Sequence, residues 1–165
     1  MRLPDGLSAL PVAQQPMAAP LWWLGVHGGA AESSLAALVP DWAAAEHQWP
    51  TPPGEERARV VLTARSNMRG LEAAQAAATQ WAAGGLPHID LLGLVVVADA
   101  PGQLPRPLRE FAQLVAGGVP RMWTIGWIEA WRMGETPELT DAPRNVRALI
   151  DELHTLTHPG ATSTT

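Results

Sequence analysis

Blocks of apolar residues alternate with blocks of mixed polarity along the chain, and this alternation predicts strands and helices in turn. The first apolar block, 21–26 (LWWLGV), is followed by the Gly-rich turn 27–31 (HGGAA). A continuous apolar run bounded by turn residues is typical of a strand that is buried on both faces. Residues 32–38 (ESSLAAL) then predict a short helix that ends before Pro40. We therefore expect strand, turn and helix in this order.

Three more strands and three more helices follow in the same alternation. The predicted strands span 59–64, 89–98 and 121–127, and the predicted helices span 69–83, 104–116 and 143–156. Residues 40–57 are rich in proline and indicate a connector with one helical turn at Trp42 to Glu46. Strands that alternate with helix-length connections favour a mostly parallel sheet with helices on its faces. The predicted fold is therefore a small α/β domain with a Rossmann-like three-layer architecture.

The chain is expected to form one domain between two tails. Residues 1–19 mix Pro, Ala, Gln and Ser without apolar periodicity, which predicts a flexible arm or an extended segment that a partner orders. Residues 20–157 contain all the predicted elements, and 158–165 are expected to be a disordered tail. With 47% apolar residues, the central part of the chain can bury a core.

Composition excludes several kinds of chemistry. All 11 basic residues are arginine, so lysine chemistry is excluded, and the chain has no cysteine for disulfides, thiolate catalysis or Cys-ligated metals. The net charge of -5 makes nucleic acid an improbable partner. Among the histidines only His154 and His158 have helix-compatible spacing, and no Glu-x-x-His pattern accompanies them, so no metal site is expected. The longest apolar run, Leu91 to Ala98, is too short to cross a membrane, and we expect a cytoplasmic protein.

The segment 25–34 (GVHGGAAESS) lies where a phosphate-binding loop belongs, between a buried strand and the start of a helix. It resembles the deviant Walker A loop of the ParA/MinD family, whose pattern is K-G-G-x-G-K-[ST]-[ST]. In this resemblance His27 replaces the signature lysine, Gly28 and Gly29 match the paired glycines, Ala31 replaces the third glycine, Glu32 replaces the phosphate-binding lysine, and Ser33 matches the magnesium ligand. Both lysines are therefore lost. Without the resemblance, Gly28 and Gly29 indicate no more than a tight turn.

The resemblance extends over residues 21–137 and implies a reduced P-loop NTPase-like fold. Residues 40–57 contain no apolar run that ends in aspartate, so the Walker B carboxylate of that family has no counterpart there. Asp99 follows the apolar run 92–98 and corresponds either to the base-recognition position or to a Walker B carboxylate. Both assignments stay open. In open α/β sheets, the end of such a strand is where ligands bind.

The loss of the lysines argues against an enzyme. A carboxylate at position 32, where an ammonium group should meet phosphate, replaces attraction by repulsion. We expect neither ATP nor GTP hydrolysis and no bound cofactor, and Gly28, Gly29, Glu32, Ser33 and Asp99 would form a vestigial site. If Glu32 is what repels phosphate in an otherwise competent loop, Glu32→Lys combined with Ala31→Gly should restore nucleotide affinity. The alternative is a divergent nucleotide-binding switch or NTPase that takes ATP or GTP with magnesium.

A tryptophan-rich segment is the candidate for protein binding. Trp123, Trp127 and Trp131 recur every four residues, and Arg132 follows. Such spacing is common in protein cores, but Trp and Arg also dominate binding hot spots. We take Trp127, Trp131 and Arg132 as a candidate interface with another protein, and a homo-oligomer is also compatible with it. The sequence further resembles an uncharacterised actinobacterial family found beside conjugation-type secretion genes, which implies an accessory role there.

Overall fold

A computed structural model describes residues 9–54 and 56–158 of the chain. Its centre is a five-stranded sheet in which all strands are parallel and follow the order β3-β2-β5-β6-β7. In chain order these strands are β2 (Trp22–Gly25), β3 (Ala43–Ala44), β5 (Ala58–Arg65), β6 (Ile89–Val97) and β7 (Met122–Ile125). The predicted α/β class, with a mostly parallel sheet flanked by helices, is confirmed.

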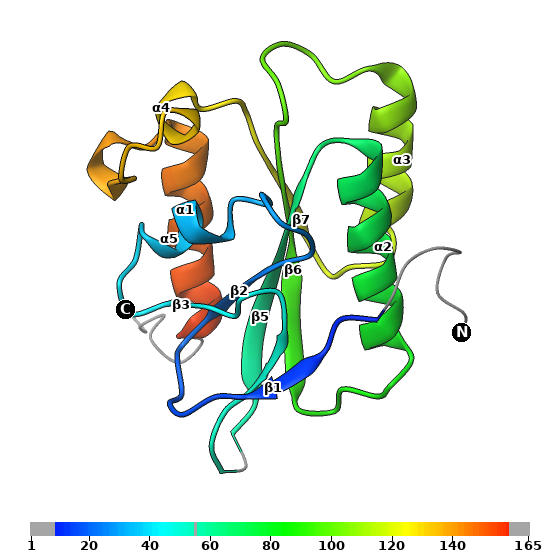
Figure 1. Cartoon of the computed structure of the whole chain (residues 1–165), viewed down its shortest axis with the longest axis vertical. Coiled ribbons are helices and arrows are strands. Elements are labelled where there is room, and N and C mark those ends of the chain that lie inside the picture. Colours follow the sequence, from blue (N-terminus) through cyan, green and yellow to red (C-terminus); the bar gives the residue numbers. More distant parts are fainter. Residues whose placement is uncertain (1–8, 55, 159–165) are drawn as a thin grey trace, which may run out of the picture.

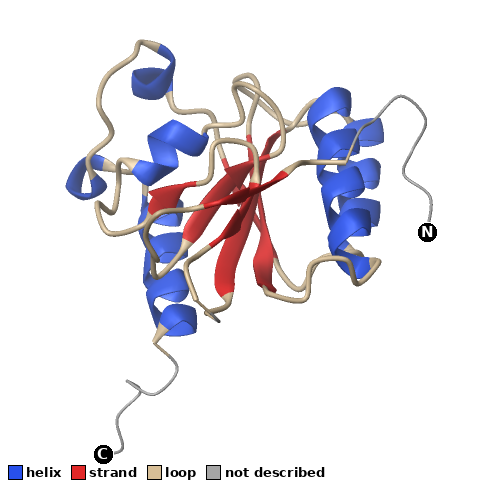
Figure 2. Ribbon diagram, turned by 60° about the horizontal axis from the view of Figure 1, so that its bottom comes forward, coloured by secondary structure: helices blue, strands red, loops and turns tan. Residues whose placement is uncertain are grey.

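Helices cover both faces of the sheet (Figures 1 and 2). They are α1 (Glu32–Ala36), α2 (Met68–Ala82), α3 (Arg106–Ala116), α4 (Glu129–Arg132) and α5 (Arg144–Thr157), with a 3-10 turn η1 at Leu139–Asp141. One core cluster joins the sheet to α2 and α3, and the other joins it to α1 and α5. The result is the three-layer arrangement expected for apolar strands buried on both faces.

The order of the strands defines a switch point in the sheet. After β2 the chain adds β3 on one side, then crosses to the other side and adds β5, β6 and β7 in succession. Numbered in chain order, the five strands therefore follow the order 2-1-3-4-5, in which ligands bind outside the carboxyl ends of the strands where the direction reverses. Here that point lies between the ends of β2 and β5.

The elements predicted from the apolar pattern are all present. Each predicted strand and helix matches an observed one, and every boundary agrees within two residues. No helix in 9–54 or 56–158 has the length and apolar character that crossing a membrane requires. Of the tail predicted for 158–165, all but His158 lies outside the described residues, as do the first eight residues of the predicted arm.

The helical turn predicted at Trp42 to Glu46 is wrong, because this segment contains the edge strand β3. Its backbone pairs with β2: the N–H of Ala43 donates to Leu21 O at 3.0 Å, and the N–H of Ala45 donates to Trp23 O at 2.8 Å. Trp42 packs in the core under α1 and α5, whereas Ala45 packs on the opposite face. Alternation across a sheet is a property of strands, and here the free edge of β2 overrides the helix propensity of the alanines.

The predicted N-terminal arm also contains a strand. Val12–Gln14 form β1, which pairs in parallel with β4 (Trp49–Thr51), another strand in the segment expected to be a connector. Leu10 is held further by Gln80 of α2, whose amide accepts from Leu10 N and donates to Leu10 O, both at 2.9 Å. The described part of the arm is thus bonded to the domain.

Candidate functional site

Adjoining cavities lie at the carboxyl edge of the sheet. The loop cavity, of about 440 Å³, is lined by 29–34 together with Ala44, Glu46, His47 and Arg65. The α2 cavity, of about 780 Å³, lies between 26–29 and the start of α2. The α3 cavity, of about 560 Å³, lies under the loop that leads from β6 into α3. The tryptophan cavity, of about 190 Å³, is bounded by Arg65, Val97, Asp99, Trp127, Ile128, Trp131 and Arg132.

The loop that follows β2 is open to solvent at its paired glycines. Gly28 and Gly29 are exposed, and a side chain added at either would meet no atom within 4 Å. Gly29 and Ala31 have φ values of 80° and 69°, so two residues of the loop before α1 have a left-handed backbone conformation. Ala31 is the position that the ParA/MinD pattern gives to glycine, which adopts this conformation without strain. Ser33, at the second position of α1, is exposed.

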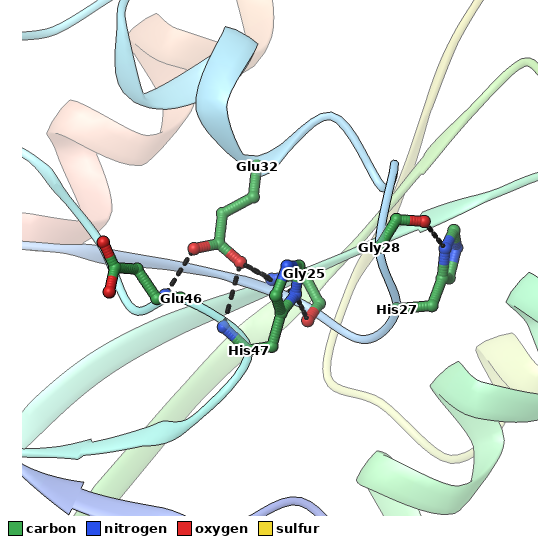
Figure 3. A network of polar contacts seen from close by, with 6 residues as sticks. All are labelled: Gly25, His27, Gly28, Glu32, Glu46 and His47. Atoms are coloured by element: carbon green, nitrogen blue, oxygen red, sulfur yellow. Dashed lines mark hydrogen bonds and ion pairs between the residues drawn. The ribbon is translucent and has the colours of Figure 1, made fainter.

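Glu32 turns away from this open loop and binds the backbone beside it (Figure 3). Its side chain is 6% exposed. One carboxylate oxygen accepts from Gly25 N at 2.5 Å and from His47 N at 3.3 Å, and the other accepts from Glu46 N at 2.5 Å. Backbone donors therefore satisfy the carboxylate, which joins the end of β2, the start of α1 and the turn after β3.

The turn after β3 depends on this carboxylate. Glu46 and His47 have φ values of 56° and 65°, a left-handed conformation that costs roughly 1–2 kcal/mol per residue for side chains of L-amino acids. Two successive N–H groups in such a turn converge on one anion, and here that anion is Glu32. His47 adds a hydrogen bond from Nδ1 to Gly25 O at 2.6 Å. A Cβ at Gly25 would lie 2.8 Å from Glu32 Oε2, so any larger residue there would displace the carboxylate.

His27 connects the loop to the neighbouring strand. Its Nε2 accepts from Arg65 N at 3.0 Å, and its Nδ1 donates to Gly28 O at 2.7 Å. These two bonds assign the proton to Nδ1 of a neutral ring. The start of α2 packs closely against this pair at Gly70. A Cβ added there would lie 3.0 Å from His27 Nε2 and even closer to Arg65 O. His27 thus tethers the backbone where the pattern has its signature lysine.

Arg65 stands at the centre of the edge. Its Nε donates to Gly29 O at 2.8 Å and its Nη1 donates to Ala98 O at 3.0 Å, so the guanidinium bridges the loops after β2 and β6. Desolvation by burial lowers the pKa of Arg65, and the charge of Asp99 opposes that shift. Arg65 lines the loop, α2 and tryptophan cavities. No sequence motif singles out Arg65, although its position at the end of an apolar run is a usable signal.

The structure brings two separate groups of predicted residues together. Asp99 is exposed, and its backbone N–H donates to Ser66 Oγ at 3.0 Å. It shares the tryptophan cavity with Trp127, Trp131 and Arg132. Gly29, Glu32 and Ser33 line the loop cavity instead, and Gly28 lines the α2 cavity. The candidate ligand edge and the candidate interface are therefore continuous.

The predicted interface residues differ in their environment. Trp127 and Trp131 are both half-buried, but Trp131 packs against the core cluster on the α5 side of the sheet, whereas Trp127 belongs to neither core cluster. The Trp127 indole donates to Glu129 at 2.7 Å, and the Arg132 guanidinium lies over its ring at 5.8 Å from the centroid. Trp123 donates to Glu152 of α5 at 2.7 Å and so supports the fold.

Within 9–54 and 56–158, no group of three or more His, Asp or Glu side chains is arranged to hold a metal ion. The fold and the site together define an open-sheet α/β domain with a candidate binding edge beside the switch point of its sheet. Residues 19–150 match the sequence model of a family of unknown function, DUF6668, and the chain belongs to this family. No curated protein and no solved structure matches the chain.

Proposed function

We propose that this protein is a non-catalytic, P-loop-like scaffold or regulatory subunit that binds another protein through residues 126–133, here called the tryptophan segment. One observation carries the proposal. Helix α4 of this segment has no buried residue, yet the segment includes two tryptophans and Met133, which is 70% exposed. Both tryptophans are half-buried, so part of each ring faces solvent beside Met133. Apolar surface gathered at one place indicates an interaction site, and Trp and Arg are enriched among the anchors of such sites.

Three side chains of the tryptophan segment contact one another. Glu129 accepts from the Trp127 indole at 2.7 Å and lies 3.9 Å from Arg132, which covers the Trp127 ring. These contacts restrict side chains that would otherwise lose rotamer freedom on binding. A preorganised Trp–Arg pair beside a small cavity is suited to receive a side chain from a partner protein.

The polar groups at the loop support the non-catalytic part of the proposal. Glu32, His27 and His47 each bind backbone atoms, so each is committed to the fold. The chain also lacks the lysine that neutralises phosphate in P-loops. Incubated with ATP or GTP and magnesium, the purified protein should show no hydrolysis above background. Steady turnover that Ser33→Ala abolishes would overturn this part of the proposal.

The binding part is tested with a variant that removes the Trp–Arg pair. The whole chain is used as bait in the native host, and each captured protein is then purified and titrated against it. Trp127→Ala combined with Arg132→Ala should weaken that binary complex at least about tenfold, as expected for hot-spot residues. Arg106→Ala is the matched control, because Arg106 is an exposed arginine on α3 whose ion pair is with Glu110. Equal affinity for the wild type and the double variant would contradict the proposal. A role beside a conjugation-type secretion apparatus predicts that the partner is a component of that apparatus.

A further inference from the structure

The five-stranded sheet ends at β7, and the outer side of this strand has no strand neighbour among the described residues. In the register with β6, Met122 lies beside Leu94, whose N–H donates to Arg121 O at 2.9 Å. Every second residue of a strand bonds to a given neighbour, so the N–H and C=O groups of Met122 and Thr124 point away from β6. They form the row of unpaired backbone groups that an edge strand presents.

This outer edge is open to another strand. Thr124 is exposed, Met122 and Trp123 are half-buried, and residues 122–125 (MWTI) contain no charged side chain and no proline. Within 9–54 and 56–158, one hydrogen bond reaches this side of β7, from Asn145 Nδ2 to Thr124 O at 3.4 Å. A carbonyl oxygen has a second lone pair and can accept another bond. The charges and prolines that commonly protect edge strands are therefore missing from β7.

We propose that two copies of this chain pair antiparallel through the outer edges of β7 and form one continuous sheet. An extended backbone satisfies a row of unpaired N–H and C=O groups, and an edge is complementary to its own copy about a twofold axis. In the register centred on Trp123, Met122 of one copy and Thr124 of the second copy exchange both of their N–H···O bonds. The twofold axis repeats this pair, so every outward group of Met122 and Thr124 is used.

The side chains favour the same register. The two Trp123 side chains form a non-hydrogen-bonded pair, the type in which side chains lie closer together. Trp123 packs half-buried on the α5 side, so the second ring adds a cross-strand aromatic contact. On the α3 side Met122 lies opposite Thr124 of the second copy, and no like charges face each other. Pro120, which has no N–H to donate, lies opposite Gly126, so pairing ends where the tryptophan segment begins.

Sedimentation equilibrium of the whole chain at increasing concentration tests for the dimer. Thr124→Pro should weaken the dimer at least about tenfold, because it removes an outward N–H that β6 does not use, a position where edge strands accept proline. Thr124→Val keeps the N–H and should dimerise like the wild type. A monomer at every concentration up to about 1 mM overturns the proposal. So does a dimer that Thr124→Pro leaves unchanged, or one that is lost only when Trp127→Ala is combined with Arg132→Ala.

The register is tested by cross-linking, which is specific because the chain has no cysteine. The two Trp123 positions would have Cα atoms about 4.5 Å apart, a separation that a disulfide spans. Trp123→Cys should therefore form a covalent dimer when oxidised with diamide. Because Trp123 also donates to Glu152, a second test leaves it in place: Met122→Cys mixed with Thr124→Cys should cross-link more than either variant alone.

A folded Trp123→Cys that stays unlinked overturns the register, as does a Met122→Cys and Thr124→Cys mixture that links no better than its components. These results leave the tryptophan segment untested, because its own test measures the affinity for a captured protein. A failure of the dimer and a failure of partner binding are thus distinguished.

Discussion

The carboxylate of Glu32 accepts a 2.5 Å hydrogen bond from the backbone N–H of Gly25, and this contact ties the first residue of α1 to the last residue of β2. From its position in the sequence, Glu32 was expected to repel phosphate within a degraded loop. Its side chain instead lies 6% exposed among backbone donors. The physical role of the residue is therefore to stabilise the edge of the sheet.

Glu32→Ala should lower the free energy of unfolding by about 3 kcal/mol, because it leaves buried backbone donors without an acceptor. Glu32→Gln keeps one carbonyl oxygen and should cost less, about 1–2 kcal/mol. Urea denaturation of both variants measures the difference. Ser33→Ala is the control, since Ser33 is exposed on the same helix and should change stability by less than ~0.5 kcal/mol. If Glu32→Ala unfolded at the same urea concentration as the wild type, the carboxylate would be dispensable for stability.

Glu32→Lys combined with Ala31→Gly, which the loop pattern predicts to restore nucleotide affinity, should instead destabilise the protein. An ammonium group at this position would face the N–H donors of Gly25 and Glu46 without an acceptor. Thermal unfolding followed by circular dichroism should show a melting temperature well below that of Ala31→Gly alone. The single variant stays folded because position 31 has φ 69°, which suits glycine. A stable double variant that binds ATP with magnesium would reverse this conclusion.

Gly25→Ala should cost about 1–3 kcal/mol of stability, the usual range for overpacking. The added Cβ would lie 2.8 Å from Glu32 Oε2 and 3.0 Å from the His47 ring, so both of these side chains would have to shift. Gly28→Ala, three residues further along, is a matched control because a Cβ there meets nothing within 4 Å. Chemical denaturation measures the stability of both variants. Similar losses of stability in Gly25→Ala and Gly28→Ala would argue against close packing of Glu32 and His47 around Gly25.

Trp131→Ala should reduce stability by about 1–2 kcal/mol, because Trp131 packs against the core on the α5 side. Trp127→Ala should cost less than ~1 kcal/mol, since Trp127 belongs to neither core cluster. The sequence pattern places both tryptophans in one candidate interface, whereas the structure makes Trp127 the variant that tests binding with the smaller effect on stability. Equal stability losses for the two variants, measured by denaturant unfolding, would remove the distinction.

Gln80→Ala should release the N-terminal segment from α2 while the domain stays folded. Two hydrogen bonds to Leu10 are lost, each worth about 1 kcal/mol. Hydrogen–deuterium exchange should become faster at Leu10 and in β1 and remain unchanged in β5 and β6. Gln113→Ala controls for helix propensity, because Gln113 is exposed on α3. Unchanged exchange at Leu10 would show that pairing with β4 holds the segment without Gln80.

The sequence determined the order, type and approximate bounds of the elements that have a long apolar run or strong helix propensity. β6 is the clearest example, because its run of apolar residues predicts a buried strand without information about its neighbours in the sheet. The sequence also placed Asp99 correctly at a strand end, on the edge where the cavities lie. Both results follow from local properties of the chain.

The features that depend on contacts between distant parts of the chain were decided by the tertiary structure alone. Strand β1 exists because it pairs with β4, and Leu10 is held by a residue 70 positions away. Ala43 becomes a strand residue because β2 offers it a free edge. The same applies to Glu32, whose carboxylate is oriented by a turn 14 residues further on, and to Arg65, whose acceptors follow two other strands. A local pattern records the propensity of a segment, whereas hydrogen-bond partners and burial are set by segments that meet only when the chain has folded.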